Sequence, residues 1–329
     1  MARIVLGIGT SHTPLLSLDP SAWHNRARAD YDNPNLTLAD GRSVSYGELV
    51  ALRGEPYAGV ATPEVFATLA DRCRKHLDHL AAEIAQARPD IVVIVGDDQA
   101  ELYSPGNIPA FAVFCGDEIA THAYGGTLPD WRRPVAEAYA MDKVHRFPAS
   151  AGFARRIVES LIDQSIDVAI ATEVPEPEKF GFGHAFGFPI KRLFGGRSIP
   201  VLPVMLNTYF PPNVPSAARC LEIGRALRTA IEAVPDALNV AILASGGLSH
   251  FVVEEELDRM VIDNLGQPDG GALGSIPRHA LLQGSSEILN WVVAAAAVSR
   301  LTLRYAAYEP LRRTPAGTGV GAAFAVWRP

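Results

Sequence analysis

The chain contains few cysteines and no cationic run. Cys73, Cys115 and Cys220 are widely spaced, and no two form a CxxC pair. This odd, scattered set argues against a disulfide framework and is typical of a reducing compartment, so we expect a cytoplasmic protein. Lys and Arg number 29 against 36 Asp and Glu, for a net charge of −7. We therefore expect no nucleic-acid partner.

Long apolar runs are also missing. The N-terminal segment MARIVLGIGTSHTP is interrupted by glycines and lacks a cleavage pattern, which predicts a strand rather than a signal peptide. The most apolar helical segment, at residues 288–298, is too short to span a bilayer. We accordingly expect no association with a membrane.

Apolar, β-branched segments instead alternate with amphipathic ones along the whole chain. The run IVVIVG at residues 91–96 is fully apolar, as in a strand covered on both faces of a sheet. The predicted strands are 3–9, 91–96, 111–115, 168–172, 200–207, 239–244 and 319–327, and the predicted helices are 62–87, 151–164, 215–233, 254–265 and 285–298. This alternation predicts a single α/β domain over residues 1–329, with a central, mostly parallel sheet flanked by helices.

Residues 17–60 are rich in Asp, Asn, Pro, Gly and Tyr, and residues 116–148 form a second irregular stretch with Gly125-Gly126 and several prolines. Long irregular stretches inside a compact domain are often functional. We interpret both as active-site insertions and residues 17–60 as a lid.

Polar residues directly follow three of the predicted strands. They are Ser11-His12, Asp97-Asp98-Gln99 and Ser249-His250. Ligands of open α/β sheets bind beyond the carboxyl ends of the strands, so we expect the three groups to meet at one cleft. A single histidine is often a buried residue bonded to a backbone carbonyl. The strand-end position of His12 favours a metal ligand, because neutral imidazole is the commonest one.

Three further features allow more than one interpretation. His250 lies in GGLSH, either as an incidental residue at a helix start or as an acid/base group. The acidic run at 254–256 suits the first turn of a helix, where it favours the helix dipole, but one of its members could bind a metal. His184 lies in GFGHAFG and suits either a substrate wall or a packed loop.

Several motifs together resemble the class III extradiol ring-cleavage dioxygenases, in particular the catalytic subunit of protocatechuate 4,5-dioxygenase and the gallate and 3-O-methylgallate dioxygenase branch. The GGLSH region is the most specific of them, followed by the first strand with SHTP. The resemblance covers most of the chain, through GTSHTP, VVIVGDDQ, NIPAFAVFCGDE, PVMLNTYFPP, EAVPDALNVAILASGGLSH, EEELDRMVIDNL and GTGVGAAFAVW.

The resemblance implies an oxidoreductase that uses Fe(II) and O₂ to open the ring of a catecholic aromatic such as protocatechuate, gallate or methylgallate. The family holds its iron with two histidines and a glutamate. Carried onto this chain, the first histidine ligand is His12 and the glutamate ligand is Glu256. The catalytic acid/base is His250, and His184 is a further active-site histidine.

The chain departs from the family at the second histidine ligand, where Asn-Asp-His is replaced by Asp97-Asp98-Gln99. A glutamine oxygen binds a divalent ion more weakly than imidazole does. Three readings stay open: Gln99 is the ligand, Asp98 or another histidine replaces it, or the metal is lost. We name Thr318, near the GTG turn, and Asp97 as candidates for substrate contact.

Two other functions stay open for the same reason. One is a protein of the same fold that binds a small molecule or a protein without oxygenase chemistry, and the other is a metal-dependent hydrolase or lyase.

In the family's protocatechuate enzyme a separate small subunit covers the active site, a role that residues 17–60 would take here. A homodimer is the expected assembly.

Overall fold

The computed structural model describes the backbone of residues 1–329 and every side chain except that of Asp269. Its centre is an eight-stranded sheet with the strand order β11-β12-β1-β10-β4-β9-β5-β8. The strands are β1 (Arg3–Thr10), β4 (Ile91–Asp97), β5 (Phe111–Phe114), β8 (Ala169–Ala171), β9 (Val201–Leu206), β10 (Asn239–Ser245), β11 (Thr302–Arg312) and β12 (Gly319–Arg328). The α/β class with a mostly parallel sheet is confirmed.

The parallel part of the sheet consists of β1, β10, β4 and β9, which are consecutive neighbours. The antiparallel strands β12 and β11 extend it on one side. On the other side β5 runs antiparallel to β9 and β8 pairs with β5. Because β1, β10 and β4 are adjacent and parallel, the polar residues that follow them emerge at the same edge.

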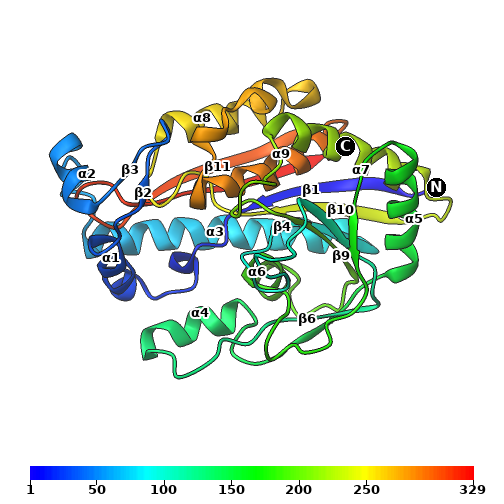
Figure 1. The fold of residues 1–329 in the computed structure, drawn as a ribbon, viewed down its shortest axis with the longest axis horizontal. Helices are drawn as coiled ribbons and strands as arrows, with labels where there is room; N and C mark the ends of the chain where they lie inside the picture. Colours follow the sequence, from blue (N-terminus) through cyan, green and yellow to red (C-terminus); the bar gives the residue numbers. More distant parts are fainter.

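Helices cover both faces of the sheet (Figure 1). The helices on one face are α5 (Ala151–Asp163), α7 (Ala217–Ala233), α8 (Glu255–Asn264) and α9 (Ile288–Ala297), and those on the other are α3 (Pro63–Ala87), α4 (Arg133–Ala138) and α6 (His184–Leu193). A hydrophobic core lies on each face of the sheet, and alternate residues of β4 pack into one or the other. Val93 and Val95 pack on one face, and Val92 and Ile94 on the opposite face. This period of two explains the fully apolar sequence of β4.

Helix α6 and strand β11 lie outside the irregular stretches and were not predicted. Helix α6 contains Gly187 and Pro189 and has a low intrinsic propensity, but seven of its ten residues are buried. Strand β11 includes Glu309 and Pro310 and lies at the edge of the sheet, paired only with β12. In both elements tertiary packing and pairing outweigh local propensity.

Residues 17–60 are not irregular, contrary to the expectation. They form α1 (Trp23–Tyr31), the hairpin of β2 (Leu36–Thr37) and β3 (Ser43–Val44), and α2 (Tyr46–Arg53). A small core joins Leu36 and Leu49 of this segment to Val252 and Ala316 of the body. In Figure 1 α1 and α2 lie at the left, the side toward which β1 runs from the N-terminus. The insertion therefore packs at the carboxyl end of the sheet.

Residues 116–148 also contain regular elements, and short 3-10 turns complete the chain. The hairpin of this segment is β6 (Glu118–Ala120) with β7 (Arg146–Pro148). The turns are η1 (Pro14–Leu16), η2 (Pro20–Ala22), η3 (Asp130–Arg132), η4 (Pro268–Ser275), η5 (Arg278–Ala280) and η6 (Gln283–Glu287).

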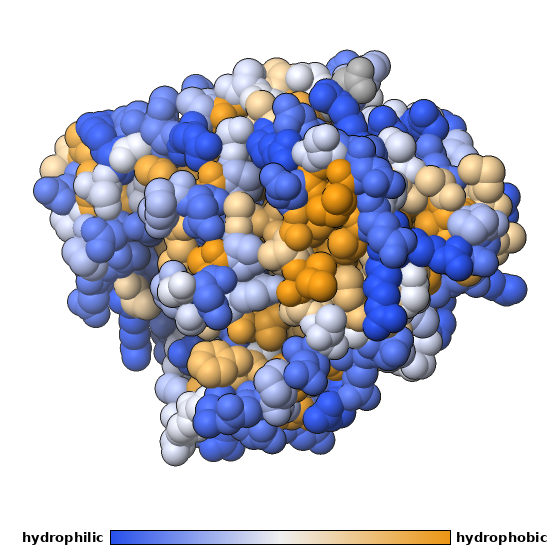
Figure 2. Space-filling view, turned by 45° about the vertical axis from the view of Figure 1, so that its right-hand side comes forward, coloured by the Kyte–Doolittle hydropathy of each residue, from blue (hydrophilic) through white to orange (hydrophobic). Residues whose placement is uncertain are grey.

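The surface is largely hydrophilic on the face drawn in Figure 2, with hydrophobic residues gathered near its centre. Among the residues described, no helix combines the length and the apolar character needed to cross a bilayer. The helix predicted at residues 285–298 is α9, which belongs to the core beside the sheet.

Candidate active site

A cavity of about 370 Å³ opens at the carboxyl ends of β1, β10 and β4. This volume is within the range of small-molecule sites. Polar residues of the three strand ends and of α6 and η6 line one part of it. They are His12, Gln99, His184, Gly247, His250 and Glu287.

His12 follows β1 and is buried. Its Nδ1 atom lies 2.9 Å from Oγ of Ser245, the last residue of the neighbouring β10. The Tyr139 hydroxyl donates to the His12 carbonyl at 2.5 Å, which fixes the backbone. The Nε2 atom is buried and has no hydrogen-bond partner among the described residues. It faces Glu287, whose Oε2 atom is 3.2 Å away.

His184 begins α6 and brings a second imidazole to the same place. Its ring packs edge-on against that of His12, with 4.6 Å between the centroids, and stacks on Tyr139. Its Nδ1 atom lies 2.9 Å from Oε1 of Glu101. Burial would lower the pKa of His184, but the charge and hydrogen bond of Glu101 outweigh it and raise the pKa to about 9.

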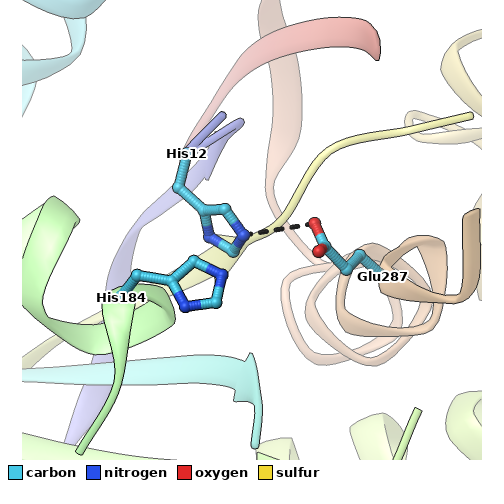
Figure 3. Close-up of side chains that lie close together, drawn as sticks. All are labelled: His12, His184 and Glu287. Carbon is cyan, nitrogen blue, oxygen red and sulfur yellow. Dashed lines mark ion pairs between the residues drawn. The ribbon is translucent and has the colours of Figure 1, made fainter. Parts of the chain in front are cut away.

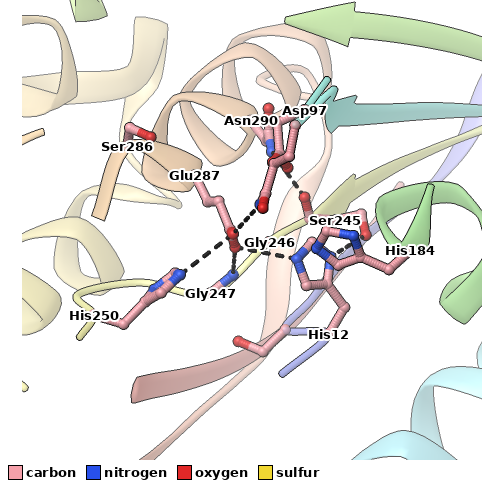
Figure 4. Close-up of polar contacts among 12 residues, drawn as sticks. His12, Asp97, His184, Ser245, Gly246, Gly247, His250, Ser286, Glu287 and Asn290 are labelled. Atoms are coloured by element: carbon pink, nitrogen blue, oxygen red, sulfur yellow. Dashed lines mark hydrogen bonds and ion pairs between the residues drawn. The ribbon is translucent and has the colours of Figure 1, made fainter. Parts of the chain in front are cut away.

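Glu287 ends η6, directly before α9, and its side chain is 3% exposed. The backbone N–H of Gly247 donates to Oε2 at 2.6 Å, while Nε2 of His250 lies 3.3 Å from Oε1 (Figure 4). Burial opposes ionisation, but the charges of His250 and His12 hold the pKa of Glu287 well below its usual range. A buried carboxylate with these partners is an anionic centre for the site.

The donor atoms of His12, His184 and Glu287 all lie within 4.8 Å of one another (Figure 3). Two imidazoles and a carboxylate suit a divalent transition metal. Nε2 of His12 lacks a hydrogen bond, and the Nδ1 atoms of His12 and His184 are held by Ser245 and Glu101. Such outer partners orient histidine ligands. The residues present therefore fit a metal ion.

His250 lies in the turn after β10, as its motif predicted, and lines the cavity. Nδ1 donates to the Leu248 carbonyl at 2.8 Å, which directs Nε2 toward Glu287. Although burial opposes it, the charge of Glu287 raises the pKa of His250 above its ordinary value. The imidazole is thus placed to exchange a proton with a molecule in the cavity.

Gln99 reaches the same cluster through its amide nitrogen. The hydrogen-bond network assigns Nε2 as donor to Asp97 Oδ2 at 2.9 Å and to Glu287 Oε1 at 3.3 Å. Asp97 is fully buried, also accepts from Asn290, and does not line the cavity. Asp98 faces backbone N–H groups of the following loop. Gln99 therefore lines the cavity and supports Glu287 through its amide, while Asp97 lies outside the cavity lining.

The structure does not bring Glu256 to this group, which corrects the expected carboxylate ligand. Glu256 is exposed on α8 and does not line the cavity, because Leu257, Asp258 and Val261 occupy the inward side of that helix. Glu287 lies beside the histidines instead. Its signal in the sequence was a single acid directly before ILNWVVAAAA, where a charge next to a fully apolar helix demands a partner.

Thr318 is also displaced from its expected role. It is completely buried, and its hydroxyl donates to Asp30 Oδ2 at 2.6 Å instead of facing the cavity. Arg26, Arg132 and Arg313 line the cavity and were not singled out from the sequence. The aromatic wall is likewise new, and consists of Tyr124, Trp131, Tyr139, Tyr209 and Phe251.

Residues 63–317 match the family described as the catalytic LigB subunit of aromatic ring-opening dioxygenase. The chain belongs to this family. The LigB match includes Gln99, His184, His250 and Glu287, while His12 precedes it. The recognition made from the motifs is confirmed.

Curated relatives of this LigB-family chain are similar over part of its length. A gallate dioxygenase of Pseudomonas putida KT2440 is 29% identical over 162 residues, 45% of this chain and 46% of the relative. A 2,3-dihydroxyphenylpropionate/2,3-dihydroxicinnamic acid 1,2-dioxygenase of Mycolicibacterium smegmatis is 28% identical over 183 residues, 53% and 50%. One of the same name from Comamonas testosteroni is 21% identical over 171 residues, 51% and 46%. The matched regions span about half of each relative.

Proposed function

We propose that this chain is an Fe(II)-dependent extradiol dioxygenase that opens the ring of a catecholic aromatic. The observation that carries the proposal is the group of His12, His184 and Glu287 beside a cavity of about 370 Å³ with an aromatic wall. The LigB family membership supports the reaction class. In this proposal His184 supplies the second imidazole that the Gln99 position lacks.

The reaction breaks the ring carbon–carbon bond next to the diol and places both atoms of O₂ in the product. The catechol itself supplies the electrons, so no further reductant is required. A bound Fe(II) would supply the redox and Lewis-acid chemistry that couples the substrate to O₂. The protein residues then have to orient the ring, exclude water and move protons.

His250 is the residue placed to move protons. Its Nδ1 atom is committed to the Leu248 carbonyl, so proton exchange takes place at Nε2, on the side of the cavity. Nε2 accepts a proton from a substrate hydroxyl and returns it as the ring opens. Tyr139 donates a hydrogen bond to the His12 carbonyl and stacks on the His184 ring, and so fixes the positions of the two histidines relative to each other.

Anaerobic loading with Fe(II), followed by oxygen electrode measurements, tests this function. Gallate, 3-O-methylgallate, protocatechuate and 2,3-dihydroxyphenylpropionate form the substrate panel. We expect stoichiometric iron and oxygen uptake that matches the appearance of a ring-opened product for at least one of them. Absence of both iron binding and oxygen uptake across the panel would refute the proposal.

Gln99 favours a second candidate, catechol binding without oxygenase chemistry. Gln99 occupies the position where the family has a histidine ligand, and its amide nitrogen donates to Glu287. This candidate predicts that catechols bind, with or without a metal, but that no oxygen is consumed. The same measurements separate the two functions.

A further inference from the structure

Three arginines, Arg26, Arg132 and Arg313, line the cavity that holds the histidine and glutamate group, and Arg132 is exposed while the other two are shielded from water. Arg26 lies on α1, in the segment of residues 17–60, and Arg313 directly follows β11. Arg313 is 5% exposed and Arg26 is partly buried, so both positive charges are largely removed from water. Buried charges require a compensating partner.

Asp30 is the carboxylate available to both of them. Arg313 donates from Nε and Nη2 to its two oxygens at 2.5 and 2.8 Å, a bidentate pair. The Thr318 hydroxyl donates to the same carboxylate, and Nη1 of Arg26 reaches it only at 3.4 Å. One carboxylate therefore balances the charge of two guanidinium groups, and its stronger hydrogen bonds are those with Arg313.

Arg26 keeps most of its donors free for another partner. Its bond to Asp30 is the one that the structure describes for it, and its guanidinium lies over the Phe251 ring at 5.5 Å from the centroid. Burial and the positive charge of Arg313 lower the pKa of Arg26 to about 10. An anion in the cavity would relieve this repulsion, because a guanidinium binds carboxylates with two parallel hydrogen bonds.

We propose that Arg26 and Arg313 form an anion subsite that receives the carboxylate of an aromatic substrate. This inference rests on the proposed function and narrows its substrates to catechols that carry an anionic substituent. The subsite shares its cavity with His12 and Glu287, so one molecule in the cavity can contact both groups. The aromatic wall, with Tyr209 and Phe251, suits the flat ring between them.

The proposed subsite also gives residues 17–60 a function in binding. Asp30 and Arg26 lie one helical turn apart on α1, and Asp30 ties that helix to Arg313 of the body. A carboxylate between Arg26 and Arg313 would add a second link between the insertion and the body. The anion would thus hold the insertion, which the sequence predicts as a lid, more firmly against the body of the protein.

Calorimetric binding of protocatechuate and of its uncharged methyl ester tests the subsite, with and without Fe(II), under anaerobic conditions. The variants are Arg26→Gln and, as a matched control, Arg28→Gln, an exposed arginine on the same helix that does not line the cavity. We expect the wild type and Arg28→Gln to bind the acid at least about tenfold more tightly than the ester. Arg26→Gln should bind both equally, with the ester affinity unchanged, and Arg26→Lys should restore part of the preference.

An unchanged preference for the acid in Arg26→Gln, or equal binding of acid and ester by the wild type, would overturn the subsite. Failure to bind either compound would overturn it as well. The proposed function fails separately: if the wild type prefers the acid but consumes no O₂ when loaded with iron, the subsite stands and the oxygenase does not. Oxygen uptake with no preference between acid and ester gives the opposite result.

Discussion

The Oε2 atom of Glu287 lies 3.2 Å from Nε2 of His12, although the two residues come from opposite ends of the chain. Both side chains are almost completely buried. Nε2 of His12 has no partner among the described residues beyond this ion pair, and together with His184 the two groups could hold a metal ion. A metal between them would satisfy both groups.

Replacing Glu287 should therefore remove the metal. We expect Glu287→Gln to lower Fe(II) affinity by more than about 100-fold, beyond the loss typical of an outer hydrogen-bonding partner. Glu256→Gln is the matched control, because Glu256 is exposed on α8 and should leave the affinity unchanged. Metal titration followed by iron analysis of the desalted protein measures both. The reverse result would restore Glu256 as the ligand.

Gln99 should act through Glu287 rather than on the metal directly. Its amide donates to Glu287 and to Asp97, so Gln99→Ala removes a support of the carboxylate but no ligand atom. We expect iron affinity to fall by about 10-fold to 100-fold, as for other outer partners, with stoichiometric iron still reached at high metal concentration. Complete loss of iron would make Gln99 a ligand, and full retention would show that its support is not needed.

The Glu101 carboxylate should make the metal-free protein sensitive to pH through His184. The pKa of His184 is raised from 6.5 to about 9, so the charged pair stabilises the fold fully below pH 6.5. This contribution is lost as the pH rises through 9. Urea unfolding of the metal-free wild type should show that loss, and Glu101→Gln should abolish it. Equal pH dependence in both proteins would contradict the pairing.

Metal binding should show the opposite trend in the same pH window. A metal has to displace the proton from His184, so the Fe(II) affinity of the wild type should rise between pH 6.5 and about 9. Anaerobic titrations at several pH values measure this. In Glu101→Gln the rise should move to lower pH, because the pKa of His184 falls without its carboxylate partner.

His250 should be needed for proton transfer but not for holding the metal. We expect His250→Asn to lower kcat by about 10²–10⁴-fold, the usual range for loss of an acid/base group. Iron content should stay stoichiometric, since His250 lies outside the group of His12, His184 and Glu287. The limb of the pH–rate profile that reports the base should also disappear. Loss of iron together with activity would instead make His250 a ligand.

Asp30 should contribute to stability, because Asp30→Asn leaves Arg313 buried without its charge partner. Breaking a buried ion pair on one side destabilises by about 3–5 kcal/mol. Chemical unfolding measures the change, with Asp32→Asn as the exposed control at the end of the same helix. The double variant Asp30→Asn/Arg313→Met should recover part of the loss. An effect of Asp30→Asn no larger than that of Asp32→Asn would show that the pair is not needed.

Much of the scaffold could be predicted because its signals are local. The apolar run of β4 and the helical spacing of α3 identify these elements from their own residues. His12 follows β1, His250 follows β10 and Gln99 follows β4. These strands pair in the order β1-β10-β4, so the residues come together provided only that the strands are parallel neighbours. The LigB family could likewise be recognised from motifs.

The tertiary structure alone decided which side chains complete the site. Glu256 and Glu287 both lie at helix starts, but α8 turns Glu256 to solvent while η6 turns Glu287 toward His12. His184 depends on α6, whose glycine and proline hide its helical character until it packs against the sheet. The amino-acid sequence by itself thus determines which strand ends carry the polar residues of the site, because the alternation of apolar residues is a local property. Which carboxylate, imidazole and guanidinium face one cavity depends on contacts between distant segments, and only packing decides those.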